Sequence, residues 1–233
     1  IKVVFSGLGG DEIFFGYDHY KKIPFLLNCF KFFKKIPFIT KLINLVLSIV
    51  SFITNDKRWK FIVKYSNSNL KLWFLKRSIF FSKEQIKVNY NNKLSISQFY
   101  KEYLNENFEY NFKNSKIHLS LLDSLFYMRN QLLRDSDWAS MYHGIELRTP
   151  FVDIDLINNL KNIMKSYSIY ENKEFIKLIF NSILPNEVVN KKKIGFQTPI
   201  IKWYEEYYNE KNKPSKKYIY NFMNDIKETF NKL

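Results

Sequence analysis

The sequence has 233 residues, of which 46% are hydrophobic and 18% aromatic, so it can bury a core and is not a disordered tail. Its formal net charge of +15 is of the kind found in nucleic-acid-binding proteins. The lysines are scattered in ones, twos and threes, however, without a sustained basic stripe or a nucleic-acid motif. Lys, Asn, Ile, Phe and Tyr are abundant together, as an AT-rich coding sequence favours. We therefore attribute the charge to compositional drift and expect no nucleic-acid partner; a basic nucleic-acid-binding module is the alternative from another class of function.

The single cysteine, Cys29, lies among apolar residues and has no partner for an internal disulfide. This usage fits a reducing compartment, and the sequence shows no secretory signal, so we expect a cytoplasmic protein. The most apolar stretch, residues 42–54, follows a region with Pro24 and Pro37. It is only about a dozen residues long, short of the roughly 18 that suggest a membrane span. Its helical spacing predicts a buried helix; a membrane-surface role is the weaker alternative.

The chain opens with residues 2–5, which predict a buried strand, and a glycine turn then leads into a helix over residues 12–22. A domain rarely opens with an interior strand, and the first residue is Ile1 rather than Met. We therefore expect a fragment of a longer protein. Residues 55–116 show short helical patterns with Asn-rich breaks and carry no recognisable chemical motif.

The second half of the chain is more regular. A strong amphipathic helix is predicted over residues 118–133, and it runs into the Arg-Asp-Ser-Asp segment at residues 134–137. Asp153 is placed to cap the helix that follows it, and another helix is predicted over residues 173–184. A charged tail that frays follows from Asn209.

The first segment that carries chemistry is Ser-Gly-Leu-Gly-Gly-Asp-Glu at residues 6–12. Glycines let the backbone approach a ligand and present its N–H groups, and a helix start adds positive potential, so this is a good phosphate-binding corner. It is neither a dinucleotide fingerprint nor a Walker A loop, because Glu12 replaces the third glycine and no Gly-Lys-Ser/Thr follows. Asp11 could hold Mg²⁺ against pyrophosphate. The alternative, equally open from the residues alone, is that Asp11 and Glu12 only complement the helix dipole.

The second segment, residues 133–153, is dense in charge yet lined with apolar residues, so we expect some of its charges to be buried and paired. One interpretation is an ion-pair network that fixes a helix corner, and it is strongest for Arg148 and Asp153. Glu146 is the better candidate for a substrate contact. The charged residues of the segment are Arg134, Asp135, Asp137, Glu146, Arg148 and Asp153.

The third segment is a basic loop at residues 190–196, in which Lys193 stands shortly before a Gly-Phe pair. A lysine on a glycine-containing loop can reach an anionic centre as charge builds there, so Lys193 is a candidate catalytic residue. For the neighbouring Lys191 and Lys192 we favour ordinary solvated side chains.

In this order and at these distances, the three segments resemble the synthetase domain of asparagine synthetase and its relatives. That family shows an S-G-x-G-x-D-E stretch after a strand, then an R-x-x-D/N-x-x-S/A-M helix leading to G-x-E-x-R-x-P-F-x-D, and finally a K-x-G-F-type loop before a tryptophan. The matching parts of this sequence are Ser6 to Glu12, Arg134 to Met141, Gly144 to Asp153, Lys193 to Phe196, and Trp203. Each motif alone is weak, but the three in register cover most of the chain.

The resemblance implies an ATP pyrophosphatase of the PP-loop class. The fold expected here is mostly α: the C-terminal portion of an α/β domain, with one parallel strand followed by a helical lobe, over residues 1–208, and then a charged tail over residues 209–233. Such an enzyme uses ATP and Mg²⁺ to adenylate a carboxylate, usually that of aspartate, and ammonia then displaces AMP to give the amide. The ammonia would come from glutamine, hydrolysed by an N-terminal glutaminase domain, and a homodimer is compatible with the resemblance.

The resemblance also assigns roles by position. The residues that resemble the ATP- and pyrophosphate-binding turn are Ser6, Gly7, Gly9 and Gly10. Asp11 resembles the acid near Mg²⁺ and pyrophosphate. Lys193 resembles the lysine that stabilises charge during adenylation and amidation, and Glu146 is carried over with it as a catalytic candidate. Arg134 and Arg148 lie at family positions that contact substrate or form structural ion pairs.

Two departures from the family pattern matter. Leu8 stands where asparagine-forming members often have a glutamate tied to forming the acyl-adenylate, and leucine cannot accept a proton. This resembles relatives in pathways for modified sugars or cell-surface polymers, so the alternative function is an amidotransferase with a non-aspartate acceptor. The upstream S-G-G-x-D-S loop that grips pyrophosphate and the glutaminase domain are both absent from the sequence. We therefore expect the isolated chain to catalyse nothing on its own.

Overall fold

The computed structural model describes residues 2–33, 36–54, 57–77, 114–170 and 173–190, together with Glu206. The chain divides into two compact units, Ile1–Pro185 and Asn186–Leu233. Of the second unit the structure describes only helix α12 (Asn186–Asn190) and Glu206, so the elements that follow are those of the first unit. Among the helices described, none is both long enough and apolar enough to cross a membrane.

The sheet in the described part of the chain consists of two short parallel strands, β1 (Val3–Phe5) and β2 (Glu146–Arg148). Their register pairs Val3 with Glu146. The strand predicted at the start of the chain is confirmed, but the prediction that it is buried is wrong. The side chain of Phe5 is 70% exposed, because β2 is the one strand that pairs with β1 among the described residues.

Two helices follow the glycine turn where one was predicted. α1 (Gly10–Ile13) is a single turn, and α2 (His19–Phe33) begins after a break at Phe15, whose φ is 54°. Pro24 lies inside α2 rather than in a connecting region. The helix continues through the proline because one of its faces packs into the core, and that packing outweighs one lost backbone hydrogen bond. The buried residues of α2 are His19, Tyr20, Ile23, Leu27 and Phe30.

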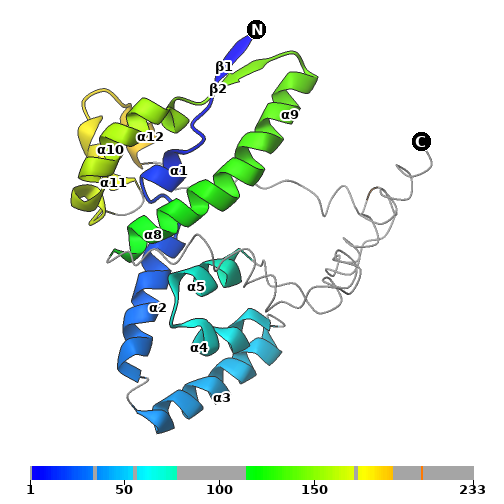
Figure 1. Cartoon of the computed structure of the whole chain (residues 1–233), viewed down its shortest axis with the longest axis vertical. Coiled ribbons are helices and arrows are strands. Elements are labelled where there is room, and N and C mark those ends of the chain that lie inside the picture. Colours follow the sequence, from blue (N-terminus) through cyan, green and yellow to red (C-terminus); the bar gives the residue numbers. More distant parts are fainter. Residues whose placement is uncertain are drawn as a thin grey trace. The chain divides into compact units, whose positions relative to one another are not determined.

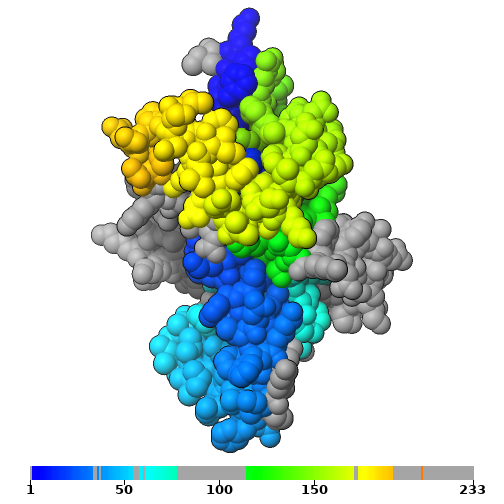
Figure 2. Space-filling view, turned by 90° about the vertical axis from the view of Figure 1, so that its left-hand side faces the viewer, coloured from blue at the N-terminus to red at the C-terminus, as the bar shows by residue number. Residues whose placement is uncertain are grey.

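The next elements are α3 (Pro37–Ile53), η1 (Lys57–Phe61), α4 (Ile62–Tyr65) and α5 (Asn69–Lys76). The apolar helix predicted at residues 42–54 is confirmed as α3, but the prediction that it is buried is wrong. α3 packs mainly on η1, and its apolar residues on another face are exposed at the surface, where α3 appears in lighter blue in Figure 2. α5, in contrast, contributes four consecutive buried side chains to the core.

The amphipathic helix predicted at residues 118–133 is confirmed and is longer than expected. α8 (Ser115–Leu122), the π-helical segment η2 (Asp123–Leu133) and α9 (Arg134–Tyr142) form one continuous helical run, the long green helix of Figure 1. The charged segment at residues 134–137 therefore lies within a helix. This corrects the expectation that its ion pairs fix a helix corner.

After β2 the chain forms η3 (Pro150–Val152), α10 (Ile154–Tyr167) and α11 (Glu174–Ile179). The prediction that Asp153 caps α10 is confirmed, because its carboxylate accepts a hydrogen bond from the Leu156 amide at 2.9 Å. The last predicted helix of this unit is shorter than expected and gives way to turns after α11.

The core of the first unit joins α1, α2, α5, α8 and α10. It is rich in aromatic rings: Tyr167 of α10 stacks on Phe175 of α11, with ring centroids 4.6 Å apart. Its buried members are Ile13, Phe14, Phe15, Tyr20, Ile23, Leu27, Leu72, Trp73, Phe74, Leu75, Leu119, Leu122 and Tyr167. Because α1 belongs to this core, the core fixes the position of the glycine turn that precedes α1.

Candidate functional site

The glycine turn joins β1 to α1 at the carboxyl ends of the two parallel strands, the edge at which α/β sheets bind ligands. The Ser6 amide donates to the Arg148 carbonyl at 2.8 Å, so the turn begins beside the end of β2. Gly9 has φ +88°, and a Cβ there would lie 2.8 Å from Val152 Cγ2. At Gly7, in contrast, a Cβ would meet nothing within 4 Å. The turn is therefore closed against η3 at Gly9 and open at Gly7, where a ligand has room to approach the backbone.

The remaining residues of the turn complete this corner. Gly10 begins α1, and a Cβ on it would lie 3.3 Å from the Phe151 ring. The Ser6 hydroxyl accepts a long hydrogen bond of 3.4 Å from the Leu8 amide. α1 has only four residues, so its dipole contributes less than the sequence suggested. The backbone N–H groups of the turn are thus the main means by which it could bind an anion.

Asp11 forms an ion pair that the sequence did not predict. Its Oδ1 lies 2.9 Å from Nζ of Lys173, and both side chains are partly exposed. Lys173 has φ 63°, in the left-handed region, and stands directly before α11. A Cβ on Gly16 would lie 2.0 Å from Asp11 Oδ1, so only glycine leaves space for that carboxylate. Asp11 is therefore held by a lysine distant in sequence, and it does more than complement a helix dipole.

Glu12 faces the interior, unlike its neighbour in the same motif. Its side chain is 1% exposed, and Oε1 accepts a hydrogen bond of 2.6 Å from the Tyr17 hydroxyl. Its carbonyl accepts another of 2.8 Å from the Ser120 hydroxyl of α8. Burial raises the pKa of the Glu12 carboxyl, and the hydrogen bond from Tyr17 opposes the rise in part. Glu12 therefore anchors α1 to α8 rather than facing a ligand.

A buried polar network lies behind this anchor and is centred on Asp123, the first residue of η2. The Asp123 carboxylate is fully buried and is 2.6 Å from Nε2 of His19. Trp73 Nε1 donates to it at 2.7 Å, and the Arg77 guanidinium donates two hydrogen bonds, at 2.5 and 3.2 Å. The guanidinium carbon also lies 3.6 Å from the centre of the Tyr127 ring. Asp123 thus joins α2, α5 and η2 through three donors.

The protonation of Asp123 follows from these partners. Burial alone raises the pKa of its carboxyl, but the hydrogen bond and charge of His19 and the charge of Arg77 lower it by more, so the net pKa lies below the ordinary value. The ring of Tyr17, which binds Glu12, lies 4.9 Å from the Arg77 guanidinium. The network therefore extends from the core to α1 and supports the glycine turn.

This network was not predicted from the sequence, because its members stand singly in apolar segments without a motif. A usable signal did exist for Asp123, since it directly follows Leu121 and Leu122 on the predicted amphipathic helix. A lone carboxylate at a core position requires a buried partner. No comparable signal marks Lys173.

The charges of the second segment are paired locally and lie at the surface. Arg148 Nε donates to Glu146 Oε1 at 2.8 Å, and Arg134 is 3.1 Å from its neighbour Asp135. All four side chains are more than half exposed. The expectation that these charges are buried is therefore wrong, because both pairs stand on outward faces of β2 and α9. Their pairing with near neighbours replaces the predicted network.

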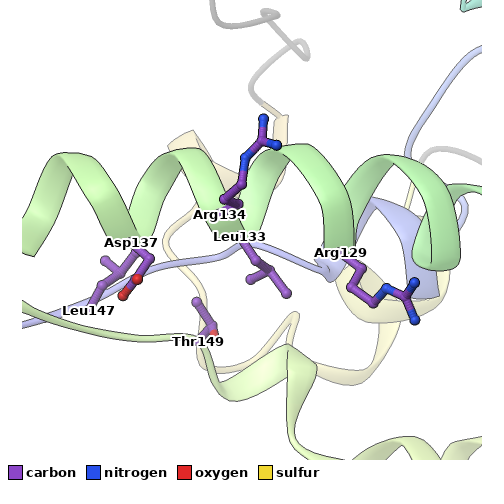
Figure 3. A pocket seen from close by; sticks show the side chains of 6 residues that line it. All are labelled: Arg129, Leu133, Arg134, Asp137, Leu147 and Thr149. Atoms are coloured by element: carbon purple, nitrogen blue, oxygen red, sulfur yellow. The ribbon is translucent and has the colours of Figure 1, made fainter.

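A cavity of about 350 Å³ lies between the helical run and β2. Leu133 and Asp137 project from the helix toward Leu147 and Thr149, whereas the Arg134 guanidinium points away from β2 (Figure 3). Arg129 is the remaining lining residue. Leu147 alternates with Glu146 and Arg148 along the strand, so that ion pair stands on the opposite face from the cavity. The cavity is lined mainly by polar groups, among them the Asp137 carboxylate and the Thr149 hydroxyl, and its apolar lining comes from Leu133 and Leu147.

No group of three or more His, Cys, Asp or Glu side chains in the described ranges is arranged to hold a metal ion. Asp11 is the carboxylate nearest the glycine turn in sequence, and one carboxylate fits the way Mg²⁺ is bound together with phosphate oxygens of a substrate. Lys193, its Gly-Phe pair and Trp203 lie outside the described residues, so the structure does not test their placement.

Comparison with known proteins supports the pattern of the three segments. A family model described as asparagine synthase matches residues 1–219. The chain is 28% identical over 216 residues to the protein named asparagine synthetase [glutamine-hydrolyzing] 1 of Bacillus subtilis (strain 168). That alignment covers 90% of this chain and 33% of the relative, so the chain spans about a third of the relative's length. No solved structure matches the chain significantly.

Proposed function

Because the chain belongs to the asparagine synthase family, we propose that it forms part of an ATP-dependent amide ligase and binds the phosphate end of ATP with its glycine turn. The observation that carries this proposal is the open backbone at Gly7, at the carboxyl end of β1, beside the Asp11–Lys173 ion pair. Gly9 and Gly10 are buried against η3, and they hold the open part of the turn in place.

Each side of this corner has a separate task. The backbone N–H groups near Gly7 donate to phosphate oxygens, and Lys173 contributes positive charge from the start of α11. Asp11 keeps Lys173 at the corner while no nucleotide is bound, because the two groups are 2.9 Å apart. When the polyphosphate arrives, its charge competes with Asp11 for the lysine and makes the carboxylate accessible.

Mg²⁺, when bound, would neutralise charge on the departing pyrophosphate, and Asp11 is the residue of this chain that would hold it. The cavity between η2, α9 and β2 is the corresponding place for the acceptor. Leu133 and Leu147 would contact the body of a small molecule there, and Arg129 supplies a positive charge for a carboxylate. We assign the catalytic lysine to Lys193 by its position in the family motif.

The chain would be the C-terminal part of a longer, cytoplasmic ligase with a PP-loop fold. In that arrangement an upstream phosphate loop and a glutaminase domain complete the site, and ammonia released from glutamine attacks an acyl-adenylate. The share of the Bacillus relative covered by the alignment supports this reading, as does the relative's name, which specifies glutamine hydrolysis. The isolated chain should neither convert ATP to AMP nor release pyrophosphate.

The test is single-turnover formation of acyl-adenylate by the protein extended with its upstream coding sequence. We expect Asp11→Ala to lower the rate roughly tenfold to a thousandfold, as losses of charge-stabilising groups do. The matched control is Asp155→Ala, which removes an exposed carboxylate from the first turn of α10. Equal rates for Asp11→Ala and the control would overturn the assignment.

Leu8 favours a second candidate within this chemistry, an amidotransferase for an acceptor other than aspartate. The residue is partly exposed between the open Gly7 and the buried Gly9, and it offers no group that could accept a proton. Leu8→Glu in the extended protein distinguishes the two candidates. A gain of asparagine formation would favour aspartate as the ancestral acceptor, and no gain would favour a different carboxylate.

A further inference from the structure

Helix α3 presents a continuous apolar stripe to the surface. Its members recur at spacings of three and four, which places them on one face of the helix. The exposed members are Phe38, Leu42, Leu45, Val46, Ile49, Phe52 and Ile53. Phe38 and Phe52, near the two ends, are 76% and 87% exposed. Soluble monomers rarely expose a row of large apolar side chains of this extent without a binding role.

The stripe is separate from the packing that holds α3 in place. Ser51 of α3 is buried, and by helical spacing it lies on the face opposite the stripe; α3 packs mainly on η1. α2 carries two further exposed aromatic side chains, Phe25 and, near its end, Phe32. α3 therefore keeps its position without the stripe, and the stripe is available to a partner.

Charge gives the nature of that partner. Residues 19–77, which include α2, α3 and α5, contain thirteen Lys or Arg residues and one acidic residue, Asp56, so they carry +12 of the chain's net +15. Lys31 of α2, Lys41 of α3 and Lys64 of α4 are exposed. The basic charge is thus concentrated in the segment that carries the apolar helix, which compositional drift alone does not require.

We propose that α3 lies flat on an anionic lipid surface, with the stripe inserted among the acyl chains and the surrounding lysines near the headgroups. An apolar helical face flanked by basic residues is the combination that binds such surfaces. α3 has 17 residues, fewer than the roughly 20 of a spanning helix, so it suits the interface plane.

Charge disfavours a second copy of the chain as the occupant. A symmetric dimer through the stripe would bring two strongly basic segments together, and their repulsion would oppose association. An anionic surface turns the same charges into an attraction. The inference does not depend on the proposed ligase activity, since the corner and the cavity use other elements.

The experiment is flotation of the 233-residue chain with vesicles of phosphatidylcholine mixed with phosphatidylglycerol, and with vesicles of phosphatidylcholine alone. We expect the chain to float with the anionic vesicles, less at high salt, and weakly with the neutral ones. The double variant Leu45→Ser, Phe52→Ser should bind roughly tenfold more weakly, because it removes apolar surface without touching charge. The matched control is Ile154→Ser, Ile169→Ser, which removes two exposed isoleucines elsewhere and should bind like the parent.

Three results would overturn the proposal: a parent chain that stays at the bottom of the gradient, a stripe variant that floats as well as the parent, or a control that loses binding equally. Sedimentation velocity completes the set. If the parent chain is a dimer, the stripe variant is a monomer and neither binds vesicles, the stripe is the contact surface for a second copy of the chain. Urea denaturation of each variant verifies that it is folded.

Discussion

The charges around Asp123 and the charges of the α9–β2 segment differ in both burial and partners. Asp123 is fully buried and bound by three side chains, His19 from α2 and Trp73 and Arg77 from α5 and its C-terminal end. The Glu146–Arg148 pair is exposed and joins residues two positions apart. The motif-bearing charges therefore contribute little to holding the fold, while charges without a motif join its elements. The charges that are conspicuous in the sequence thus lie at the surface, whereas the buried charges that join the elements have no sequence motif.

Removing the centre of the buried network should have the largest effect on stability. We expect Asp123→Ala to lower the free energy of unfolding by about 3–5 kcal/mol, because Arg77 and His19 then remain in the interior without their carboxylate. The matched control is Asp135→Ala on α9, which breaks an exposed pair and should cost less than about 0.5 kcal/mol. Urea denaturation followed by far-UV circular dichroism measures both. Similar losses for the two variants would remove the distinction between the two regions.

The next largest effects are expected at two glycines of the turn, of which Gly9 is closely packed and Gly7 is open. Gly9→Ala places a Cβ in the left-handed region and against Val152, so it should lower the free energy of unfolding by about 1–3 kcal/mol. Gly7→Ala enters open space and should leave stability within about 0.5 kcal/mol. In the extended protein, Gly7→Ala should instead weaken ATP binding, measured by titration calorimetry. If Gly7→Ala destabilises the fold as much as Gly9→Ala does, the open corner is not as described.

Sequence patterns were most informative where a local rule applies. The strand before the glycine turn, the cap at Asp153 and the long amphipathic helix each follow from spacing or from one side chain. Burial could not be read in the same way, because it depends on what else covers an element. The helix predicted from the spacing of apolar residues in α3 is confirmed, but those residues outnumber the ones that η1 can cover. Likewise, β1 has no second neighbouring strand among the described residues.

The candidate site shows the same limit. The position of Asp11 follows from its motif, but its partner Lys173 comes from a segment more than a hundred residues away and reaches it through a left-handed backbone. Only the packing of α10 and α11 against the core brings the two together. Long-range pairs of this kind leave no periodic pattern in one sequence, so the motif predicted Asp11 but not Lys173.

The buried carboxylates should differ in how they respond to pH. Burial raises the pKa of Glu12 above its ordinary 4.5, so its contribution to stability is fully present below about pH 4.5 and is lost as pH rises through its folded-state pKa. Asp123, with a lowered pKa, contributes above its ordinary pKa of 3.8 and loses that contribution as pH falls. In Glu12→Gln, stability should therefore fall less as pH rises, while the loss of stability at low pH should be unchanged. Urea midpoints across a pH series measure this; a parallel curve for Glu12→Gln would contradict the buried assignment.

The smallest effect on stability is expected at Glu146. Variants of this residue and its partner Arg148 test whether Glu146 serves only their ion pair or also acts in the reaction. Glu146→Gln and Arg148→Gln each break the same exposed pair, so each should cost less than about 0.5 kcal/mol. If Glu146 serves only that pair, the two variants of the extended protein should form product at equal rates. If it instead contacts the substrate, as the sequence pattern suggested and contrary to placing the acceptor in the cavity, Glu146→Gln alone should slow amide formation roughly tenfold to a hundredfold, the loss of one hydrogen bond to a charged group. A rate difference without a stability difference would place Glu146 in the reaction, since a structural pair affects both partners alike.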